Sequence, residues 1–246
     1  MPLDVRRLTT DDVARMMDFA VLNREYGWER YAAGCELARK YRFAAYHVLP
    51  AWVKPVVNEI GDFAREHAIE IGAPVSFPYG ASHSLLKLKE AELLIEQGAT
   101  ALDMVANIGW LKDGRHEDYA RECRDHVRLC HEAGIGAKII IAVGYLTGEE
   151  IRTATRMVID AGADFVKTAT GTGPPGRPTF DDVHAIMDTI RSAGAKTRIK
   201  VSGIVEPKVL NAYAFISMGA HRIGTRDAAR VVDSLAEIQE TVYHAE

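Results

Sequence analysis

The chain has 246 residues, of which 48% are hydrophobic and 26% are charged, and its formal net charge is −4. This length and composition are typical of one soluble globular domain with a large core. The weak negative charge gives no reason to expect nucleic acid or an anionic membrane as a partner. No stretch approaches the roughly 20 consecutive apolar residues of a membrane span.

The cysteines are odd in number and form no CxxC pair: Cys35, Cys123 and Cys130. This pattern is typical of free thiols in a reducing compartment, because disulfide frameworks use an even set of cysteines. The first ten residues already carry Asp4 and Arg6, unlike the apolar run of a signal peptide. We therefore expect a cytoplasmic protein.

Short apolar runs alternate with amphipathic stretches along the whole chain. The predicted strands are, in chain order, Asp18–Val21, Phe43–Val48, Pro74–Phe77, Ala101–Val105, Ala137–Ala142, Asp164–Lys167, Arg198–Ser202 and His221–Ile223. The predicted helices are Leu85–Gln97, Tyr119–Ala133, Glu149–Ala161, Phe180–Ala193 and Pro207–Met218. A glycine just past a helix is a C-terminal signal, and it recurs here at Gly98, Gly134, Gly162, Gly194 and Gly219. This recurrence indicates a repeated αβ unit with a parallel sheet.

Eight strands alternating with helices is the number found in a closed (β/α)8 barrel. The alternative α/β architecture, a doubly wound open sheet, usually carries a glycine-rich nucleotide turn after its first strand, and Asp18–Asn23 has none. We therefore predict an α/β fold with a single (β/α)8 TIM barrel domain over residues 1–246.

Barrel active sites collect where strands end. Lys167 ends the sixth predicted strand, Lys200 lies near the end of the seventh, and Asp103 lies in the fourth. Two further charged residues lie in predicted strands, Lys138 in the fifth and Asp18 at the start of the first.

A charged lysine is costly to bury, so lysines inside a barrel need an explanation. A lysine that attacks a carbonyl must be partly neutral, and both desolvation and a neighbouring cation lower its pKa. Adjacent strands would place Lys167 and Lys200 side by side, with Asp103 able to relay protons. The alternative is an ion-pair network that only fills the barrel.

These residues lie in segments that resemble the 2-deoxyribose-5-phosphate aldolases, which are Schiff-base (class I) aldolases, and the resemblance extends over nearly the whole chain. Gly98–Gly114 resembles the family's fourth-strand signature, Ala161–Gly171 its Schiff-base strand, and Arg198–Gly203 the strand with the second lysine. Weaker similarities are Met17-Asp18, Leu22-Asn23, Phe77–Gly80 and Arg222–Thr225.

The resemblance implies that Lys167 forms an imine with the donor carbonyl, that Lys200 lowers its pKa, and that Asp103 transfers protons with an ordered water. The implied reaction is reversible cleavage of 2-deoxy-D-ribose 5-phosphate to acetaldehyde and glyceraldehyde 3-phosphate, with no cofactor and no metal. The residues expected to bind substrate are Thr170, Gly171, Gly203, Gly224, Arg226, Asp18, His47 and Lys138.

The histidines are scattered and show no HxxxH pair. His47 lies in the second predicted strand, near its end. Two interpretations stay open for it: a polar contact in the pocket, or a packed, hydrogen-bonded histidine.

Several departures from the family fall in the substrate-reading loops. Ile204 follows Gly203 where the family has a second glycine, and a β-branched residue disfavours a positive φ. Arg226 replaces a phosphate-binding serine and could hold a phosphate or a carboxylate, or be an ordinary surface arginine. Other substitutions are Ala169 for serine, Ala142 for glutamate, and Phe19-Ala20 for a pair ending in threonine.

The reaction class is therefore predicted more firmly than the substrate. One alternative is a related class I aldolase with another donor, such as a small ketone, or another acceptor. A second alternative is a non-catalytic sugar-phosphate-binding barrel. A third is a metal-dependent aldolase, and activity that persists in EDTA would exclude this third alternative. By analogy with similar barrels we also expect a homo-oligomer.

Overall fold

The structure is a computed structural model and describes residues 3–174 and 176–242. Its strands are β1 (Met17–Val21), β2 (Ala45–Val48), β3 (Glu70–Val75), β4 (Ala101–Val105), β5 (Gly136–Ile140), β6 (Phe165–Lys167), β7 (Arg198–Ser202) and β8 (Arg222–Thr225). Its helices are η1 (Val5–Arg7), α1 (Thr10–Ala14), α2 (Trp28–Tyr41), η2 (Pro50–Trp52), α3 (Val53–Glu66), α4 (Ser84–Glu96), α5 (Ile108–Lys112), α6 (His116–Glu132), η3 (Val143–Tyr145), α7 (Gly148–Asp160), α8 (Phe180–Ser192), α9 (Lys208–Met218), α10 (Ala228–Asp233) and α11 (Leu235–Val242).

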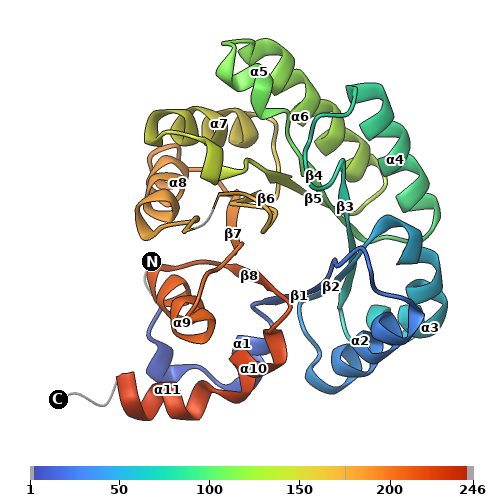
Figure 1. Cartoon of the computed structure of the whole chain (residues 1–246), viewed down its shortest axis with the longest axis vertical. Coiled ribbons are helices and arrows are strands. Elements are labelled where there is room, and N and C mark those ends of the chain that lie inside the picture. The colour runs from blue at the N-terminus through green and yellow to red at the C-terminus, as the bar shows by residue number, and fades with distance from the viewer. Residues whose placement is uncertain (1–2, 175, 243–246) are drawn as a thin grey trace.

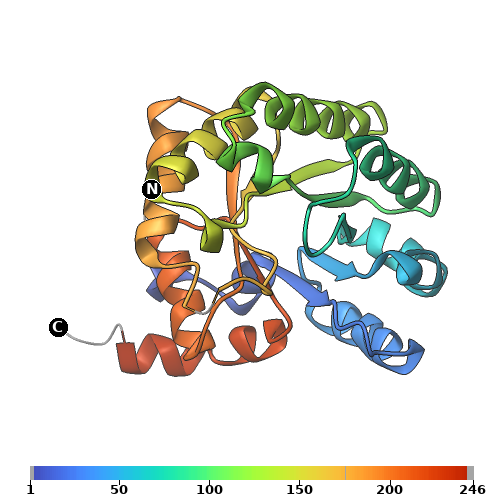
Figure 2. The same cartoon turned by 45° about the horizontal axis from the view of Figure 1, so that its top comes forward.

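The strands close into a parallel barrel in chain order, from β1 to β8, and β8 pairs with β1. The helices form a ring outside the strands (Figure 1), and the tilted view shows the strands running through its centre (Figure 2). This architecture confirms the predicted (β/α)8 barrel. None of the helices in the described ranges combines the length and the apolar character that crossing a bilayer requires.

Most strand residues are buried, because one face of the sheet fills the lumen and the other contacts the helices. In β4, for example, every residue is buried, which explains its nearly continuous apolar sequence. Each repeated unit also has local helix signals. Thr147 and Glu150 form a reciprocal capping box at the start of α7, and Gly162 follows that helix with a φ of 79°.

The third strand is the largest difference from the predicted elements. It spans Glu70–Val75 rather than Pro74–Phe77. Its first half contains Glu70 and Gly72, which are poor strand formers, and pairing with both neighbours overrides that preference. The strand ends at Val75, and the next residue, Ser76, has a φ of 54°. The helices α2 and α3 also lie outside the predicted ranges.

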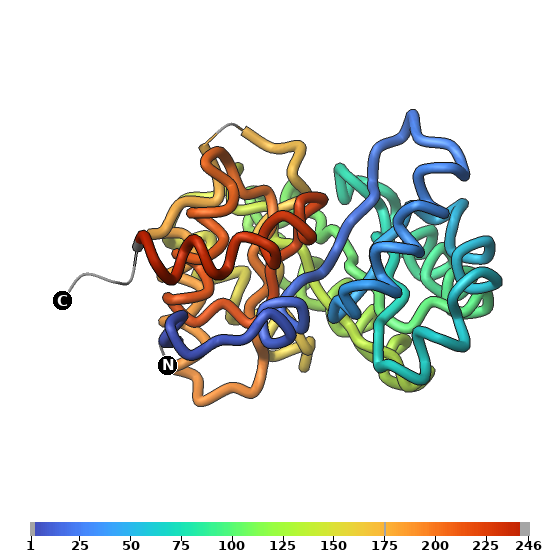
Figure 3. The backbone as a smooth tube through the Cα atoms, turned by 90° about the horizontal axis from the view of Figure 1, so that it is seen from below, coloured from blue at the N-terminus to red at the C-terminus, as the bar shows by residue number. Residues whose placement is uncertain are grey.

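The two ends of the described chain meet beside the barrel. Gln239 in α11 donates hydrogen bonds to the carbonyl oxygens of Val5 (2.9 Å) and Leu8 (3.0 Å). The tube view shows this red helix beside the blue N-terminal segment (Figure 3). These hydrogen bonds tie the N-terminal segment to the last described helix.

Candidate functional site

A cluster of buried ionisable groups occupies the barrel lumen, with Asp103 at its centre. Asp103 Oδ2 accepts hydrogen bonds from Lys167 Nζ (2.8 Å) and Lys200 Nζ (2.7 Å). Asp103 Oδ1 lies 3.0 Å from His47 Nε2. These side chains come from β4, β6, β7 and β2, and none is more than 4% exposed. The structure therefore brings together the three residues expected to be catalytic.

The strand register places the two lysines side by side. Lys167 on β6 and Lys200 on β7 are direct Cα partners. Because paired residues of neighbouring strands face the same side of the sheet, both side chains enter the lumen and reach the same carboxylate oxygen. The predicted ion-pair network is therefore present, and it contains the lysine expected to be the nucleophile.

A second layer of charges surrounds this centre. Lys200 Nζ lies 2.7 Å from Asp18 Oδ2, and Lys138 Nζ lies 2.7 Å from Glu70 Oε2. Arg222 contacts both of these carboxylates, at 2.6 Å for Asp18 and 3.4 Å for Glu70. The cluster of basic groups is Lys138, Lys167, Lys200 and Arg222, and its carboxylates are Asp18, Glu70 and Asp103. One basic group is in excess, so the cluster favours the loss of one proton.

Lys167 has the environment that favours loss of a proton. Burial lowers its pKa, the charge of Lys200 lowers it further, and the opposing attraction of Asp103 does not cancel them, so the pKa of Lys167 falls to about 8. Lys138 behaves oppositely. Burial also lowers its pKa, but Glu70 and Asp103 outweigh burial and raise it above the ordinary value. Only Lys167 of these two lysines is prepared to act as a neutral amine.

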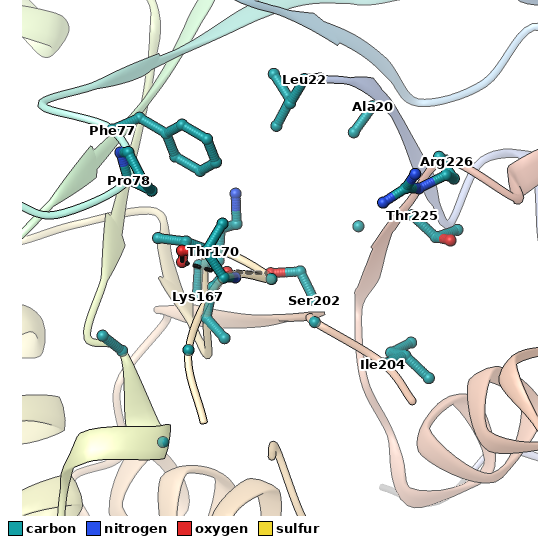
Figure 4. Close-up of a pocket in the computed structure, with 18 of the residues that line it drawn as sticks. Ala20, Leu22, Phe77, Pro78, Lys167, Thr170, Ser202, Ile204, Thr225 and Arg226 are labelled. Atoms are coloured by element: carbon teal, nitrogen blue, oxygen red, sulfur yellow. Dashed lines mark hydrogen bonds between the residues drawn. The ribbon is translucent and has the colours of Figure 1, made fainter. Parts of the chain in front are cut away.

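A cavity of about 790 Å³ opens above the cluster, at the carboxyl ends of the strands. Lys167, Lys200 and His47 reach its wall, and the remaining predicted residues on the wall are Thr170, Gly171, Gly203, Gly224 and Arg226. Figure 4 shows Lys167 and Thr170 on one side of the cavity and Arg226 with Thr225 across from them. The cavity therefore contains most of the residues expected to bind substrate.

Three predicted residues do not line this cavity: Asp18, Lys138 and Asp103. For Asp103, a position beneath the cavity wall fits the expected role of transferring protons to and from groups above it. Asp18 and Lys138 were expected to contact substrate, but they lie in the second layer, paired with Lys200 and Glu70 respectively. Position along the strand explains the difference, because both residues lie nearer the amino ends of their strands than the cavity floor does.

Two glycines on the wall provide room for the lysines and the neighbouring loops. A Cβ atom on Gly224 would lie 2.9 Å from Ser202 Cβ and 3.1 Å from Lys200 Cε. Gly203 has a φ of 82°, and a Cβ there would lie 3.1 Å from Ala169 Cβ. A side chain at either position would displace the loop or Lys200.

Two arginines on the wall lie near one carboxylate, that of Glu25, which also lines the cavity. Arg226 and Arg24 are exposed, and neither makes a hydrogen bond or salt bridge to a described residue. Arg24 follows β1 and Arg226 follows β8, and these two strands are paired. Lys208 also lines the cavity but pairs with Asp227 at 2.9 Å. The side of the cavity formed by β1 and β8 therefore carries two arginines near one carboxylate, and neither arginine is held in a salt bridge to a described residue.

The sequence analysis did not identify Arg24, Lys208 or Glu70. The rule that barrel sites follow strand ends would have selected Arg24, three residues after β1. Glu70 lay outside the predicted third strand, and the sequence carries no local signal that places it in the lumen. Among the residues that the structure describes, no three His, Cys, Asp or Glu side chains are grouped so as to hold a metal ion.

Replacing Lys200 with methionine should raise the pKa of Lys167 above about 8, because it removes a neighbouring positive charge. Imine formation needs the neutral amine, so its rate rises with pH through this pKa. In the variant that rise should move to higher pH, and the rate at pH 7 should fall about tenfold if the pKa rises by about one. The measurement is the rate of imine formation against pH. An unchanged profile would remove Lys200 from the mechanism.

The likeness of the chain to known proteins agrees with this geometry. The sequence model of the DeoC/LacD family aldolases matches residues 60–225. Among curated relatives, the deoxyribose-phosphate aldolase of Thermococcus gammatolerans is 35% identical over 90% of this chain and 96% of its own, and that of Bacteroides thetaiotaomicron is 32% identical over 96% and 95%. The solved deoxyribose phosphate aldolase of Aeropyrum pernix is 25% identical, with a TM-score of 0.82 and 95% of each chain covered. The chain belongs to the DeoC/LacD aldolase family.

Proposed function

We propose that this aldolase works through an imine on Lys167 and that its substrate is 2-deoxy-D-ribose 5-phosphate, cleaved reversibly to acetaldehyde and glyceraldehyde 3-phosphate. The observation that carries the mechanism is a lysine with a pKa of about 8 at the floor of the cavity, hydrogen-bonded to Asp103 at 2.8 Å. The names of the relatives support the choice of substrate.

The first step is attack of the neutral Lys167 amine on the donor carbonyl. Loss of water gives a protonated imine, which withdraws electrons from the adjacent carbon. In the cleavage direction, the hydroxyl group two carbons from the imine carbon loses its proton. The electron pair of that O–H bond forms the new carbonyl, and the electron pair of the broken carbon–carbon bond forms the enamine. Protonation of the enamine and hydrolysis then release acetaldehyde and regenerate Lys167.

Lys200 and Asp103 have separate tasks in this proposal. Lys200 keeps the pKa of Lys167 low through its charge, because the two amines share Asp103 Oδ2. Burial opposes the charged form of Asp103, but His47, Lys167 and Lys200 outweigh it and hold the pKa of Asp103 well below the ordinary value. Asp103 is therefore a carboxylate that can accept protons, with an ordered water as the proposed intermediary.

Borohydride reduction in the presence of acetaldehyde tests the imine directly. A mass increment should appear on the peptide that contains Lys167, in proportion to the neutral fraction of that amine. Lys138 provides an internal control, because its pKa is raised and it should remain unlabelled. Label on Lys138 or Lys200, or no label with acetaldehyde or with a small ketone as donor, would contradict the assignment.

We further propose that Arg226 and Arg24, which form no salt bridge to a described residue, bind the anion of the substrate. Ile204 occupies the place of a glycine, and its side chain hinders close approach to the backbone, so the family's usual phosphate cradle of backbone N–H groups cannot form in the same way there. Arg226 lies across the cavity from Lys167 and has no competing salt bridge to a described residue (Figure 4). Thr170, Gly171, Gly203 and Gly224 shape the wall between them.

Replacing Arg226 with alanine should lower kcat/KM for the phosphorylated sugar by roughly 10- to 150-fold, the value of one charge-assisted hydrogen-bonded pair. The loss should be absent for deoxyribose without its phosphate. Comparison of both substrates in both enzymes gives the test, with Arg156→Ala on the outer surface of α7 as the matched control. Equal losses on both substrates would show that Arg226 reads no anion, and would favour a different acceptor.

Three further proposals concern the domain organisation, the cellular compartment and the oligomeric state. We propose that residues 1–246 act as one barrel domain and that the protein is cytoplasmic, which its three free, buried cysteines support. We also propose a homo-oligomer, supported by the relative from Aeropyrum pernix, whose structure is described as tetrameric. Light scattering of the purified protein tests this assembly, and a monomer across the working concentration range would contradict it.

A further inference from the structure

His47 is the member of the lumen cluster that links Asp103 to the cavity. Asp103 is fully buried and does not line the cavity, whereas His47 does. The ring's Nε2 lies 3.0 Å from Asp103 Oδ1, and the other oxygen of Asp103 contacts Lys167. His47 therefore lies between Asp103 and the cavity whose wall also includes Lys167.

The contacts of Nε2 determine which ring nitrogen carries the proton. Asp103 is a carboxylate and can only accept, so a deprotonated Nε2 would place its lone pair against an anionic oxygen at 3.0 Å. The proton therefore lies on Nε2, although Lys200 Nζ is also near, at 3.3 Å. This tautomer leaves the lone pair on Nδ1, and Nδ1 is a buried nitrogen with no hydrogen-bond partner among the described residues.

An acceptor without a partner is unusual in a protein interior and costs free energy. The residues beside His47 on the neighbouring strands are nevertheless small and leave space for its ring. Gly72 on β3 is the Cα partner of His47, and a Cβ atom there would lie 2.5 Å from His47 Nε2. On the other side the partner on β1 is Ala20, a small residue of the cavity wall. Burial lowers the pKa of His47, and the attraction of Asp103 does not reverse this, so the ring is neutral at pH 7.

We propose that His47 is an acid–base catalyst of the aldol reaction, with Asp103 holding its tautomer. This role rests on the proposed imine mechanism and adds a named proton carrier to it. In cleavage, Nδ1 takes the hydroxyl proton while the carbon–carbon bond breaks and its electron pair enters the enamine. The resulting imidazolium, stabilised by Asp103, then gives the same proton to the enamine carbon. His47 ends unchanged, and no other reactant is consumed.

The charged groups that act on this ring are Asp103 on β4, Lys200 on β7 and Asp18 on β1. The other charged members of the cluster are paired with these groups or with one another: Lys167 on β6, Lys138 on β5, Glu70 on β3 and Arg222 on β8. A base must be neutral to accept a proton, so activity should fall as the pH drops through the pKa of His47. The pH dependence of Lys167 has the same sign but lies near pH 8, so the two are separable.

The test is His47→Gln, whose amide can still donate to Asp103 but cannot carry the proton. We expect borohydride trapping on Lys167 to persist, while cleavage and the exchange of acetaldehyde methyl hydrogens in D₂O both slow by about 100-fold, the low end of general-base contributions. The acid limb that belongs to His47 should also disappear from the pH profile. His184→Gln, an exposed histidine on α8, is the matched control and should retain full activity.

Cleavage and exchange within about threefold of the parent would overturn the proposal, as would loss of trapping together with activity, because the ring would then only support the lysine. If His47→Gln does not fold, His47→Asn is measured by the same criteria. Absence of trapping in the parent enzyme would refute the imine mechanism itself and this inference with it. Trapping in the parent with a fully active His47→Gln would refute the inference alone.

Discussion

Replacing Lys167 with arginine should lower kcat by roughly 10⁵-fold or more, which is the scale observed when a covalent nucleophile is removed. Arginine keeps a positive charge beside Asp103, so that carboxylate remains compensated and the barrel should fold. It cannot act as an amine nucleophile, because the guanidinium stays protonated at any pH at which the enzyme works. The expected loss therefore separates the chemistry of Lys167 from its charge.

The measurement is kcat for cleavage of 2-deoxyribose 5-phosphate, together with borohydride trapping in the same preparation. Both signals should vanish, while the thermal unfolding midpoint changes little. Lys196→Arg, at an exposed lysine before β7, is the matched control and should leave activity and trapping intact. Substantial turnover by Lys167→Arg would place the imine on another lysine or exclude an imine mechanism.

The second large effect is expected for Asp103→Asn, which keeps the side-chain shape but removes the base. The value of kcat should fall by at least about 100-fold. The same change removes the anion that opposes the low pKa of Lys167, so that pKa should fall further below about 8. Imine formation at neutral pH should therefore persist while turnover is lost. If Asp103 had only a structural role, its replacement would not abolish turnover while leaving imine formation intact.

Stability has to be measured alongside, because Asp103 compensates several buried cations. Removing one partner of a buried ion pair costs about 3–5 kcal/mol, so the variant should unfold at lower denaturant concentration. Activity is therefore expressed per folded molecule. Full activity per folded molecule, with reduced yield, would show that Asp103 serves only the fold. If His47 and Asp103 act as one unit, the double variant with His47→Gln should be no slower than the slower single variant.

The cavity residues that depart from the family pattern are expected to affect the choice of substrate but not the imine chemistry. Lys167, Lys200 and Asp103 form one connected cluster, which leaves the imine chemistry independent of the loops above it. The substitutions Ile204 and Arg226 lie in those loops, on the far side of the cavity. A change of acceptor would therefore leave the trapping experiment unaffected and alter only the comparison of phosphorylated and unphosphorylated sugars.

The sequence by itself determined the barrel and the positions of the candidate reactive residues along it. The spacing of apolar runs predicted β4 and β7 to the residue, and the glycines after the helices marked the repeat. These signals are local, because each depends on a few adjacent residues. Lys167 and Lys200 were identified in the same way, since a lysine inside an apolar strand is unusual in any context.

Only the tertiary structure decided which of these groups touch. Pairing of β6 with β7 sets Lys167 beside Lys200, and closure of β8 onto β1 brings Arg226 and Arg24 to the same side of the cavity. Tertiary pairing also drew Glu70 into a strand that its own residues disfavour. Likewise, it placed Asp18 and Lys138 beneath the cavity rather than in its wall. The physical reason is that register and closure depend on hydrogen bonds between all the strands of the barrel, and no short segment of sequence encodes them.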